Sequence, residues 1–399
     1  MTSQHPSTNG VQFHSQTPFW RDERVIRIAL QVITAVLAIG LLYWVISNVI
    51  NAAEQRGLSL GFDFLDESAG FPIGESDLPY DPSRSFLYAF TVGVINTLKV
   101  SIIGVFFATI LGIIVGIARL SSNWLISRIA LAFIEFHRNI PLLVLLLLWY
   151  RGVFIKLPKV QDSYIWPGPI YINQRGLFLT WPRFTPQSTP FVLFTVIGIL
   201  LAITAWIVLR RIRETTGRNT YFGLVSVVIL VVFPAIGLLI AGGQPFEADV
   251  PVLSGFNFKG GYQLSPEFIA LLVGLVTYTA AFIAEVVRAG IQSVSKGQHE
   301  AARAVGLKSS HILGLVIMPQ ALRVIIPPLI SQYLNLTKNS SLAIFIGYPE
   351  IFFIGKTTIN QAGRAVQVFL VVMAVYLSIS LVTSFILNIY NRRIQLVER

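Results

Sequence analysis

Long, uninterrupted apolar runs recur along this chain, and they constrain its fold more than any other feature. A helix needs about 20 mostly apolar residues to cross a bilayer. Candidate spans run from Ile28 to Ile46, Leu98 to Ala118, Ile140 to Phe154, Phe191 to Leu209, Phe222 to Ala241, Phe268 to Val287, Ala321 to Leu336 and Val366 to Leu387. Because a helix satisfies its own backbone hydrogen bonds in lipid, the sequence predicts an all-α polytopic membrane protein with about eight transmembrane helices.

Composition excludes several other classes of protein. Charged residues make up 12% of the chain, whereas an average soluble domain carries about 25%. A membrane β-barrel would alternate in polarity, and runs such as Val227 to Phe233 do not. The formal charge of +11 comes without a basic run interleaved with aromatic residues, so nucleic acid is not an expected partner. The chain has no cysteine, which excludes thiolate metal sites, and we expect neither a metal nor a cofactor.

Lysine and arginine segregate into alternate loops, as they do when they mark the cytoplasmic side. The basic set is Arg21, Arg24, Arg27, Arg119, Arg128, Arg138, Arg210, Arg211, Arg213, Arg218, Arg288, Lys296, Arg303, Lys308, Arg392, Arg393 and Arg399. We therefore expect both termini in the cytoplasm, as tails of residues 1–24 and 391–399. The acidic loop after the first span then faces outward, and so does the stretch from Arg151 to Pro190, whose Pro, Gly and Trp content predicts a folded periplasmic insertion.

The loop between the sixth and seventh spans reads SVSKGQHEAARAVGLKSSHILGLVIMPQALR. Ser295 and Gln298 predict a capping box at a helix start, and Gly306 can end that helix with positive φ. Ser309 can cap a second short helix, which Pro319 interrupts before the next span. We expect a bent pair of helices at the cytoplasmic surface, with small alanines that let another protein approach closely.

This loop, residues 295–319, resembles the EAA motif of ABC importer permeases: E-A-A, three residues, G, nine residues, then I-x-L-P. The matching residues are Glu300, Ala301, Ala302, Gly306 and Pro319, with Arg303 at the rim of the expected contact. Val316 and Met318 stand where the pattern has isoleucine and leucine. In that family the motif sits in a groove of a cytoplasmic ATPase, so the resemblance implies two ATPase subunits and a periplasmic binding protein as partners.

ATP hydrolysis is expected on those separate subunits, because the chain contains no G-x-x-x-x-G-K-[ST] loop to hold nucleotide phosphates. The chain itself is therefore expected to be a transport subunit and not an enzyme. His299 and Glu300 begin a zinc-protease pattern, but Arg303 occupies the position of its second histidine.

Further stretches are similar to the polar amino acid branch of these permeases. They are INTLKVS from Ile95, GIARLSSN from Gly116, FHRNIPLL from Phe136, AEVVRAGIQS from Ala284 and NLTKNSSLA from Asn335. The resemblance covers residues 90–390 and implies a five-helix type I importer core. Residues 25–89, an N-terminal helix with a periplasmic loop, and the insertion 151–265, a periplasmic segment with two helices, are extra to that core.

Such an enlarged chain resembles one of the two permease subunits of general L-amino-acid transporters, which take polar and acidic amino acids broadly. The resemblance implies a heterodimer with a second permease, surrounded by lipid of the bacterial inner membrane, that works by alternating access. A homodimer, another small polar solute, and an ion-coupled secondary transporter, which often shows inverted repeats, remain alternatives. The amino acids carried are not determined by the sequence.

Ionisable residues inside spans are costly and often mark a passage. Glu285 and Lys338 are our candidates for a translocation pathway, with Asn335 and Asn339 beside Lys338. Structural pairing within the bundle is the alternative for each. Lys99 and Arg288 also lie in spans, but nearer the ends, where a long side chain can reach the interface.

Two features bear on packing and motion. Gly112 and Gly116 form a G-x-x-x-G step that favours close helix contact. Pro327 and Pro328 lie in the span after the motif, where lost hydrogen bonds can kink a helix and carry motion from the loop towards the passage.

Overall fold

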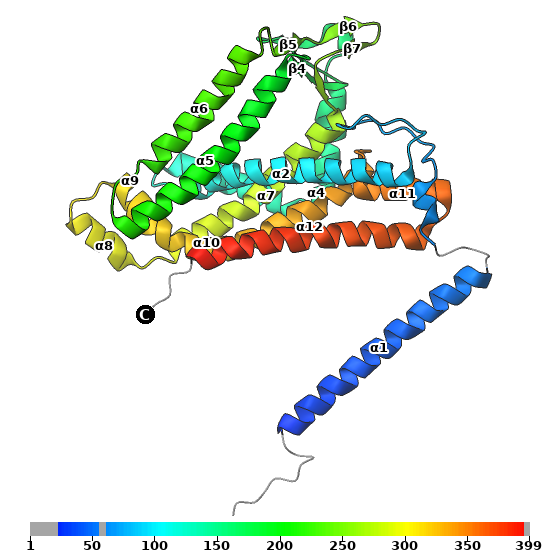
Figure 1. The fold of residues 1–399 in the computed structure, drawn as a ribbon. Helices are drawn as coiled ribbons and strands as arrows, with labels where there is room; N and C mark the ends of the chain where they lie inside the picture. Colours follow the sequence, from blue (N-terminus) through cyan, green and yellow to red (C-terminus); the bar gives the residue numbers. More distant parts are fainter. Residues whose placement is uncertain (1–22, 56–60, 395–399) are drawn as a thin grey trace, which may run out of the picture. The chain divides into compact units, whose positions relative to one another are not determined.

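The computed structural model describes residues 23–55 and 61–394 (Figure 1). The α-helices are α1 (Glu23–Gln55), α2 (Phe86–Arg119), α3 (Trp124–Asn139), α4 (Leu142–Leu147), α5 (Ser188–Thr216), α6 (Phe222–Ile240), α7 (Pro266–Gln292), α8 (Lys296–Ala304), α9 (Ser309–His311), α10 (Met318–Asn339), α11 (Ile351–Ala362) and α12 (Ala365–Ile394). Short 3-10 or π-helical segments are η2 (Asp63–Asp66), η3 (Leu148–Val153), η4 (Phe154–Lys156), η5 (Val160–Asp162), η6 (Ile312–Ile317) and η7 (Ser340–Phe345). Residues 1–22 and 395–399, which make up most of the two expected cytoplasmic tails, lie outside the described residues.

Seven described helices are long and apolar enough to cross a membrane, and the bent pair of α3 and α4 raises the number to eight. This confirms the predicted all-α polytopic architecture with about eight spans. Some helices begin before the predicted apolar run, at a residue that caps their first turn. Ser85, for example, caps α2 well before the predicted start at Leu98, its Oγ accepting from the backbone N–H of Tyr88 at 3.3 Å.

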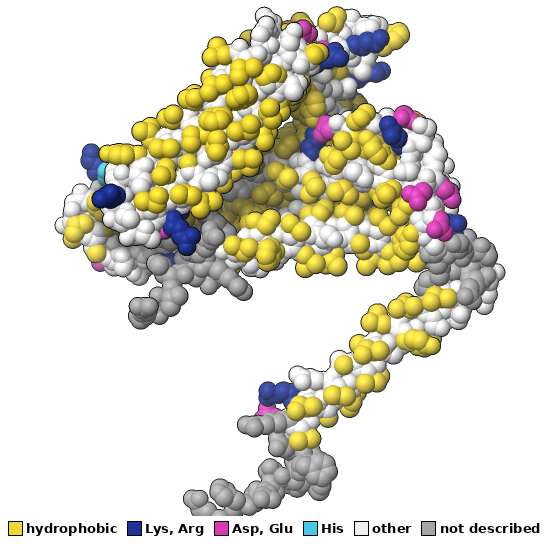
Figure 2. Space-filling view, viewed as in Figure 1, with side chains coloured by type: hydrophobic (Ala, Val, Ile, Leu, Met, Phe, Trp, Pro, Cys, Tyr) yellow, Lys and Arg dark blue, Asp and Glu magenta, His cyan; other side chains and the backbone are white. Residues whose placement is uncertain are grey.

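Exposed apolar side chains cover α5, α6 and α12. Figure 2 shows hydrophobic side chains spread along these helices, with charged ones gathered near helix ends and loops. Leu200, Leu239 and Phe385 are 60%, 83% and 68% exposed. An apolar surface of this extent is incompatible with a water-soluble monomer, and it is the surface that a membrane-embedded bundle presents to lipid.

The helix α1 belongs to a unit separate from the one that α2 to α11 form. It covers the apolar run predicted from Ile28 to Ile46, and none of its most apolar window is buried. On its first turn Arg27 donates to the Glu23 carboxylate at 2.8 Å. Taken by itself, α1 is a long apolar helix of spanning length.

Helices α2 and α7 pack along one another at the centre of the bundle, and α3, α4, α10 and α11 surround them. The predicted G-x-x-x-G step lies in this contact. A Cβ on Gly112 would lie 2.5 Å from Cγ2 of Ile283, and one on Gly116 would lie 2.8 Å from the carbonyl oxygen of Ala284. Both glycines therefore serve close helix packing, as the sequence indicated.

Replacing Gly116 by alanine is expected to destabilise the bundle. The new methyl group would meet the α7 backbone, which cannot rotate away, and overpacking of this kind costs about 1–3 kcal/mol. The measurement is the thermal unfolding midpoint of the detergent-purified protein. The matched control is Gly297→Ala on α8, where an added Cβ meets nothing within 4 Å; equal midpoints for both variants would contradict this packing role.

Helix α3 is an element that the apolar runs did not reveal. Its side chains alternate between buried Ala130 and Ile134 and the exposed opposite face, so it lacks a continuous apolar stretch. Asn123 caps the helix, its side chain accepting from two backbone N–H groups. The helix ends where Ile140 takes an extended conformation before Pro141. The predicted single span from Ile140 to Phe154 is thus the second arm of a pair bent by 105°.

The insertion 151–265 contains short strands that an all-α reading omits. They are β1 (Tyr164–Trp166), β2 (Ile170–Asn173), β3 (Gly176–Leu179), β4 (Trp181–Phe184), β5 (Phe246–Asp249), β6 (Val252–Ser254), β7 (Asn257–Lys259) and β8 (Tyr262–Leu264). The four-stranded sheet has the order β1-β2-β3-β8, and β4 pairs with β5, in both cases antiparallel. Strands from before α5 therefore pair with strands from after α6, so the helical hairpin projects from a single small β module.

The loop before α11 contains a fully buried carboxylate, Glu350. Its oxygens accept from the backbone N–H groups of Phe352 at 2.9 Å and Phe353 at 2.8 Å, and the Tyr376 hydroxyl on α12 donates to it at 2.7 Å. Burial raises the pKa of Glu350 to about 7. This carboxyl caps α11 and fastens its first turn to α12.

The stability of the protein is expected to fall as pH rises from about 4.5 to about 7, because the folded state then loses a proton that it holds more tightly than the unfolded state. The contribution from Glu350 is about 3 kcal/mol. The measurement is the thermal unfolding midpoint of the purified wild type and of Glu350→Gln across this pH range. The difference between the two isolates the contribution of Glu350. The midpoint of the wild type should decline relative to that of the amide variant, and parallel profiles would rule Glu350 out as the titrating group.

Candidate functional site

The loop 295–319 contains the helix α8, and its end is fixed by a Schellman motif. The N–H of Leu307 donates to the carbonyl of Ala302 at 3.2 Å, and that of Gly306 donates to Arg303 at 2.9 Å. Gly306 has φ of 81°, as predicted for a residue that ends the helix. The predicted capping box is incomplete, since Ser295 is the N-cap residue but its side chain makes no cap hydrogen bond.

One side chain of α8 packs against the bundle, and others are exposed. Ala302 is 5% exposed and belongs to the apolar cluster that contains Ile312 and Ile317. Glu300, Ala301 and Arg303 are exposed, as is Val305 beyond them at 76%. One alanine of the motif thus holds the helix to the bundle, while the other leaves room for a close neighbour.

The second part of the loop is continuous with α10, which corrects the predicted break at Pro319. Lys308, and not Ser309, is the N-cap residue of α9. The chain then passes through the π-helical turn η6 directly into α10, where Pro319 falls in the first turn. Ile317, just before α10, also has helical dihedral angles, so Pro319 removes one backbone hydrogen bond without ending the helical segment. The second half of the loop and α10 therefore form one continuous helical segment.

Helix α10 presents a partly polar open face. Asn335 and Lys338 are exposed, together with Ser331 one turn earlier, and Asn339 is half-buried. Pro327 and Pro328 lie on the same exposed face. Two neighbouring hydroxyls, of Thr337 and Ser340, instead donate to carbonyls of the same helix at 3.1 and 2.7 Å. The structure thus leaves the polar groups of Asn335 and Lys338 available to something outside this bundle.

Glu285 lies elsewhere, at the other end of the bundle, and is not brought to Lys338. Its Oε2 accepts from Nη2 of Arg288 at 2.7 Å, and Arg288 also donates to Gln292 at 2.6 Å. Gln292 is the last residue of α7, next to the loop 295–319. Glu285 is therefore engaged in an ion pair near the loop end of α7, in a setting that differs from the open polar face of α10.

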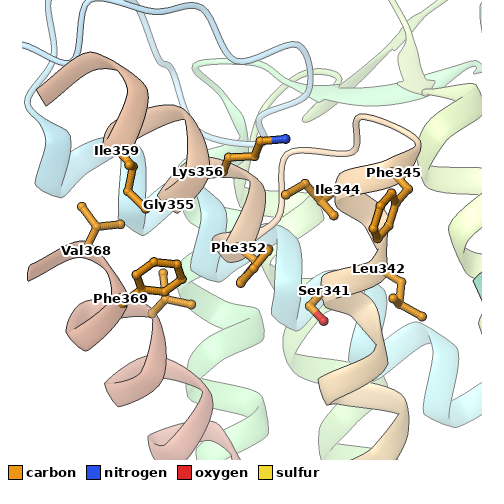
Figure 3. A pocket seen from close by; sticks show the side chains of 11 residues that line it. Ser341, Leu342, Ile344, Phe345, Phe352, Gly355, Lys356, Ile359, Val368 and Phe369 are labelled. Carbon is orange, nitrogen blue, oxygen red and sulfur yellow. The ribbon is translucent and has the colours of Figure 1, made fainter. Parts of the chain in front are cut away.

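An apolar pocket of about 520 Å³ lies between η7, α11 and α12 (Figure 3). Most of its lining is apolar, with Phe352, Val368 and Phe369 among it, and Ser341 and Lys356 are the polar residues of the lining. A polar solute must exchange its hydrogen bonds with water for new ones, and two polar side chains in an otherwise apolar lining replace few of them. We therefore do not assign this pocket to the pathway.

A charged cluster at the opposite end from the loop was not identified from the sequence. Nζ of Lys99 on α2 lies 2.9 Å from Glu75 and 3.2 Å from Asp77, and all but Asp77 are nearly buried. Tyr262 donates to Asp77 at 2.8 Å, and Ser265 donates to Glu75. Lys99 thus binds the segment before α2 to the bundle. The sequence did contain a signal for this cluster, since a lysine inside a predicted span follows a loop rich in acidic residues.

In the part of the chain that the structure describes, no group of three His, Cys, Asp or Glu side chains could hold a metal ion. His299 and Glu300 accordingly contribute to no metal cluster there.

The chain's resemblance to known proteins can now be set against this geometry. A family model described as binding-protein-dependent transport system inner membrane component matches residues 108–396, which include α7, the loop 295–319 and α10. The chain belongs to this family. It is an ABC importer permease, as the EAA motif indicated, and family membership excludes the alternative of an ion-coupled secondary transporter.

Relatives of this permease match almost end to end. The general L-amino acid transport system permease protein AapQ of Rhizobium johnstonii is 41% identical over 382 residues, which cover 95% of this chain and 94% of that protein. The putative amino-acid ABC transporter permease protein YhdX of Escherichia coli is 42% identical, covering 92% and 94%. The glutamate/glutamine/aspartate/asparagine transport system permease protein BztB of Rhodobacter capsulatus is 38% identical, covering 95% and 96%. At this coverage the similarity extends through the insertion, beyond the family core.

Proposed function

We propose that this chain is the permease subunit of an importer that moves L-amino acids, polar and acidic ones among them, across the bacterial inner membrane by ATP-driven alternating access. The observation that carries the proposal is the continuity of the exposed EAA loop with α10, the helix that presents an open polar face. The loop receives movement from an ATPase, and the helix delivers it to the passage.

The coupling begins at α8. Glu300, Ala301 and Arg303 face outward for contact with the ATPase, while Ala302 packs in the same cluster as Ile312 and Ile317 of η6. Displacement of α8 therefore presses on the π turn that leads into α10. Closure of two ATPases on ATP binding shifts this helix, and hydrolysis resets it.

The passage borders α10. Polar side chains at membrane depth are costly against lipid and are found beside protein or water. Asn335 and Lys338 are exposed in the single chain, so a second permease and a water-filled passage supply the missing surroundings. The Lys338 ammonium suits the side-chain carboxylate of acidic amino acids. The role of Glu285 is structural in this scheme, since Arg288 already neutralises it.

The topology follows from the coupling loop. With the loop 295–319 in the cytoplasm, the β module and the segment before α2 face the periplasm, where a solute-loaded binding protein docks. Both termini then lie inside. The second permease is a different chain, as in the two-permease systems that the enlarged chain resembles.

Amino acids are the proposed cargo because the relatives that match end to end are named for amino-acid transport. The test is uptake of labelled acidic, amide, basic and aliphatic L-amino acids in cells that lack the chain and in complemented cells, with a sugar and an inorganic anion as controls. Loss confined to several amino acids is expected on deletion. Unchanged uptake of every amino acid would overturn the proposed cargo.

Docking of the ATPase can be tested by disulfide trapping, because the chain has no cysteine of its own. One cysteine replaces the exposed Val305 and another is placed in the groove of the ATPase. Oxidation is expected to crosslink the two subunits in the assembled transporter. An absence of crosslinks at every groove position, with folded subunits, would refute docking through this loop.

A further inference from the structure

A polar cleft of about 410 Å³ lies at the end of α7 opposite the coupling loop. Pro266 and Glu267, the first residues of α7, line it. The last residue of the same helix, Gln292, adjoins the loop 295–319. In the proposed topology the cleft opens on the periplasmic side, some 40 Å along a single helix from the site of ATPase coupling.

Three side chains from three different elements give the cleft its chemistry. Arg175 lies in the turn between β2 and β3, Asn257 begins β7, and Glu267 lies on α7; all three line the cleft. Arg175 is exposed, and no described carboxylate lies within ion-pair distance of its guanidinium. Asn257 Oδ1 is buried without a hydrogen-bond partner among the described residues. Glu267 accepts one hydrogen bond, from the Tyr150 hydroxyl at 2.6 Å through Oε1.

The second carboxylate in the cleft is already engaged. Glu75 lines it too, but Lys99 and Ser265 bind the two oxygens of that carboxylate. The groups left available therefore include one cation, one carboxylate and one buried amide oxygen, beside the amide of Gln174. The Glu267 carboxylate would repel a simple anion, and the Arg175 guanidinium would repel a metal cation. A zwitterion that presents a carboxylate and an ammonium satisfies all three groups.

The backbone of Arg175 is fixed in advance of any ligand. Its backbone N–H donates to Asn173 Oδ1 at 2.8 Å, and its carbonyl accepts from Gln263 Nε2 at 3.0 Å. The following residue, Gly176, has φ of 118°, and a Cβ there would collide with the carbonyl of Leu264 on β8. The turn is thus held against β8, at the edge of the cleft, and binding would require no ordering of its backbone.

We propose that this cleft binds a free L-α-amino acid, which Arg175 holds by the α-carboxylate and which Glu267 and Asn257 hold by the α-ammonium. This inference rests on the amino-acid transport proposed above. Arg175 and Asn257 come from the insertion and Glu267 from the core, so the insertion supplies two of the three groups of a periplasmic receiving site. A solute released from the binding protein occupies this site before it enters the passage beside α10.

The cysteine-free chain allows a direct test of occupancy. Gln174 lines the cleft next to Arg175, and Gln174→Cys introduces a reporter whose alkylation by a membrane-impermeant methanethiosulfonate can be timed. The assembled transporter in proteoliposomes is probed with L-glutamine and L-glutamate. Either amino acid is expected to slow alkylation, whereas N-acetylated and carboxamide derivatives, which each lack one charge, are not. Ser254→Cys on β6, outside the cleft, should be modified at the same rate throughout.

Two variants tie the protection to the assigned groups. Arg175→Ala and Glu267→Gln, each added to the reporter, should raise the amino-acid concentration needed for half-protection at least about tenfold, since each removes a hydrogen bond to a charged group. Arg183→Ala, an exposed arginine of β4 outside the cleft, is the matched control and should leave protection unchanged. Protection that survives both cleft variants would overturn the proposal.

The outcome is separable from the proposed function. Transport of amino acids by the reporter protein is measured in the same vesicles. If the vesicles transport amino acids and the Gln174→Cys reporter is never protected, the receiving site is refuted while the function stands. If no amino acid is transported and none protects, both are refuted.

Discussion

Replacing Ala301 by tryptophan is expected to abolish ATP-driven uptake while the permease remains folded in the membrane. Ala301 is exposed on α8, so a larger side chain can extend outward from the bundle. It would hold the ATPase away from the helix. Uptake should fall more than about tenfold, because central interface positions contribute about 2 kcal/mol or more.

The control for this variant is Thr215→Trp, an exposed site in the last turn of α5, outside the EAA loop and on the same expected side of the membrane. It should transport normally. Co-purification of the ATPase with each variant separates lost docking from lost transport. An Ala301→Trp transporter with wild-type uptake would show that α8 does not lie against the ATPase.

Replacing Lys338 by methionine is the second substitution with a large expected effect. The side chain is exposed on α10 and makes no ion pair among the described residues, so the fold should tolerate the change. Uptake of glutamate and aspartate should fall at least about tenfold, since a hydrogen bond to a charged group contributes about 1.5–3 kcal/mol. Uptake of neutral amino acids should fall less.

Val324→Met provides the matched control for Lys338→Met, because Val324 is also exposed on α10 but carries no charge. Rates are compared at equal amounts of transporter in the vesicles. Equal uptake of acidic amino acids by the two variants would remove Lys338 from the pathway.

The helices that apolar runs predict are those whose whole circumference is apolar, such as α5 and α6. Helix α3 was not predicted, because burial of Ala130 and Ile134 needs only one apolar face and no continuous apolar run. The packing of that face on α2 and α7 becomes apparent only in three dimensions. The strands of the β module were not predicted for a different reason. Each has only three or four residues, and β3 and β4 pair across the intervening α5–α6 hairpin, which no local pattern encodes.

The sequence likewise predicted one part of the candidate site and not the other. The spacing of Glu300, Ala301 and Gly306 identified the coupling loop, because its function depends on a short contiguous motif. Sequence could not tell that Ala302 is buried while Ala301 is exposed, since both alanines fit the pattern equally. Residues brought together from distant segments, such as Arg175 and Glu267, carry no joint signal along the chain, and only the fold reveals them as neighbours of one cleft.

The most direct test of the whole account is uptake of labelled L-glutamate into proteoliposomes that contain this chain, its partner permease and the ATPases, with the binding protein outside and ATP sealed inside. We predict accumulation that requires both ATP and the binding protein and that disappears with Ala301→Trp. Accumulation without ATP, or none under any condition for any amino acid in a folded complex, would contradict the assignment as an ATP-driven amino-acid permease.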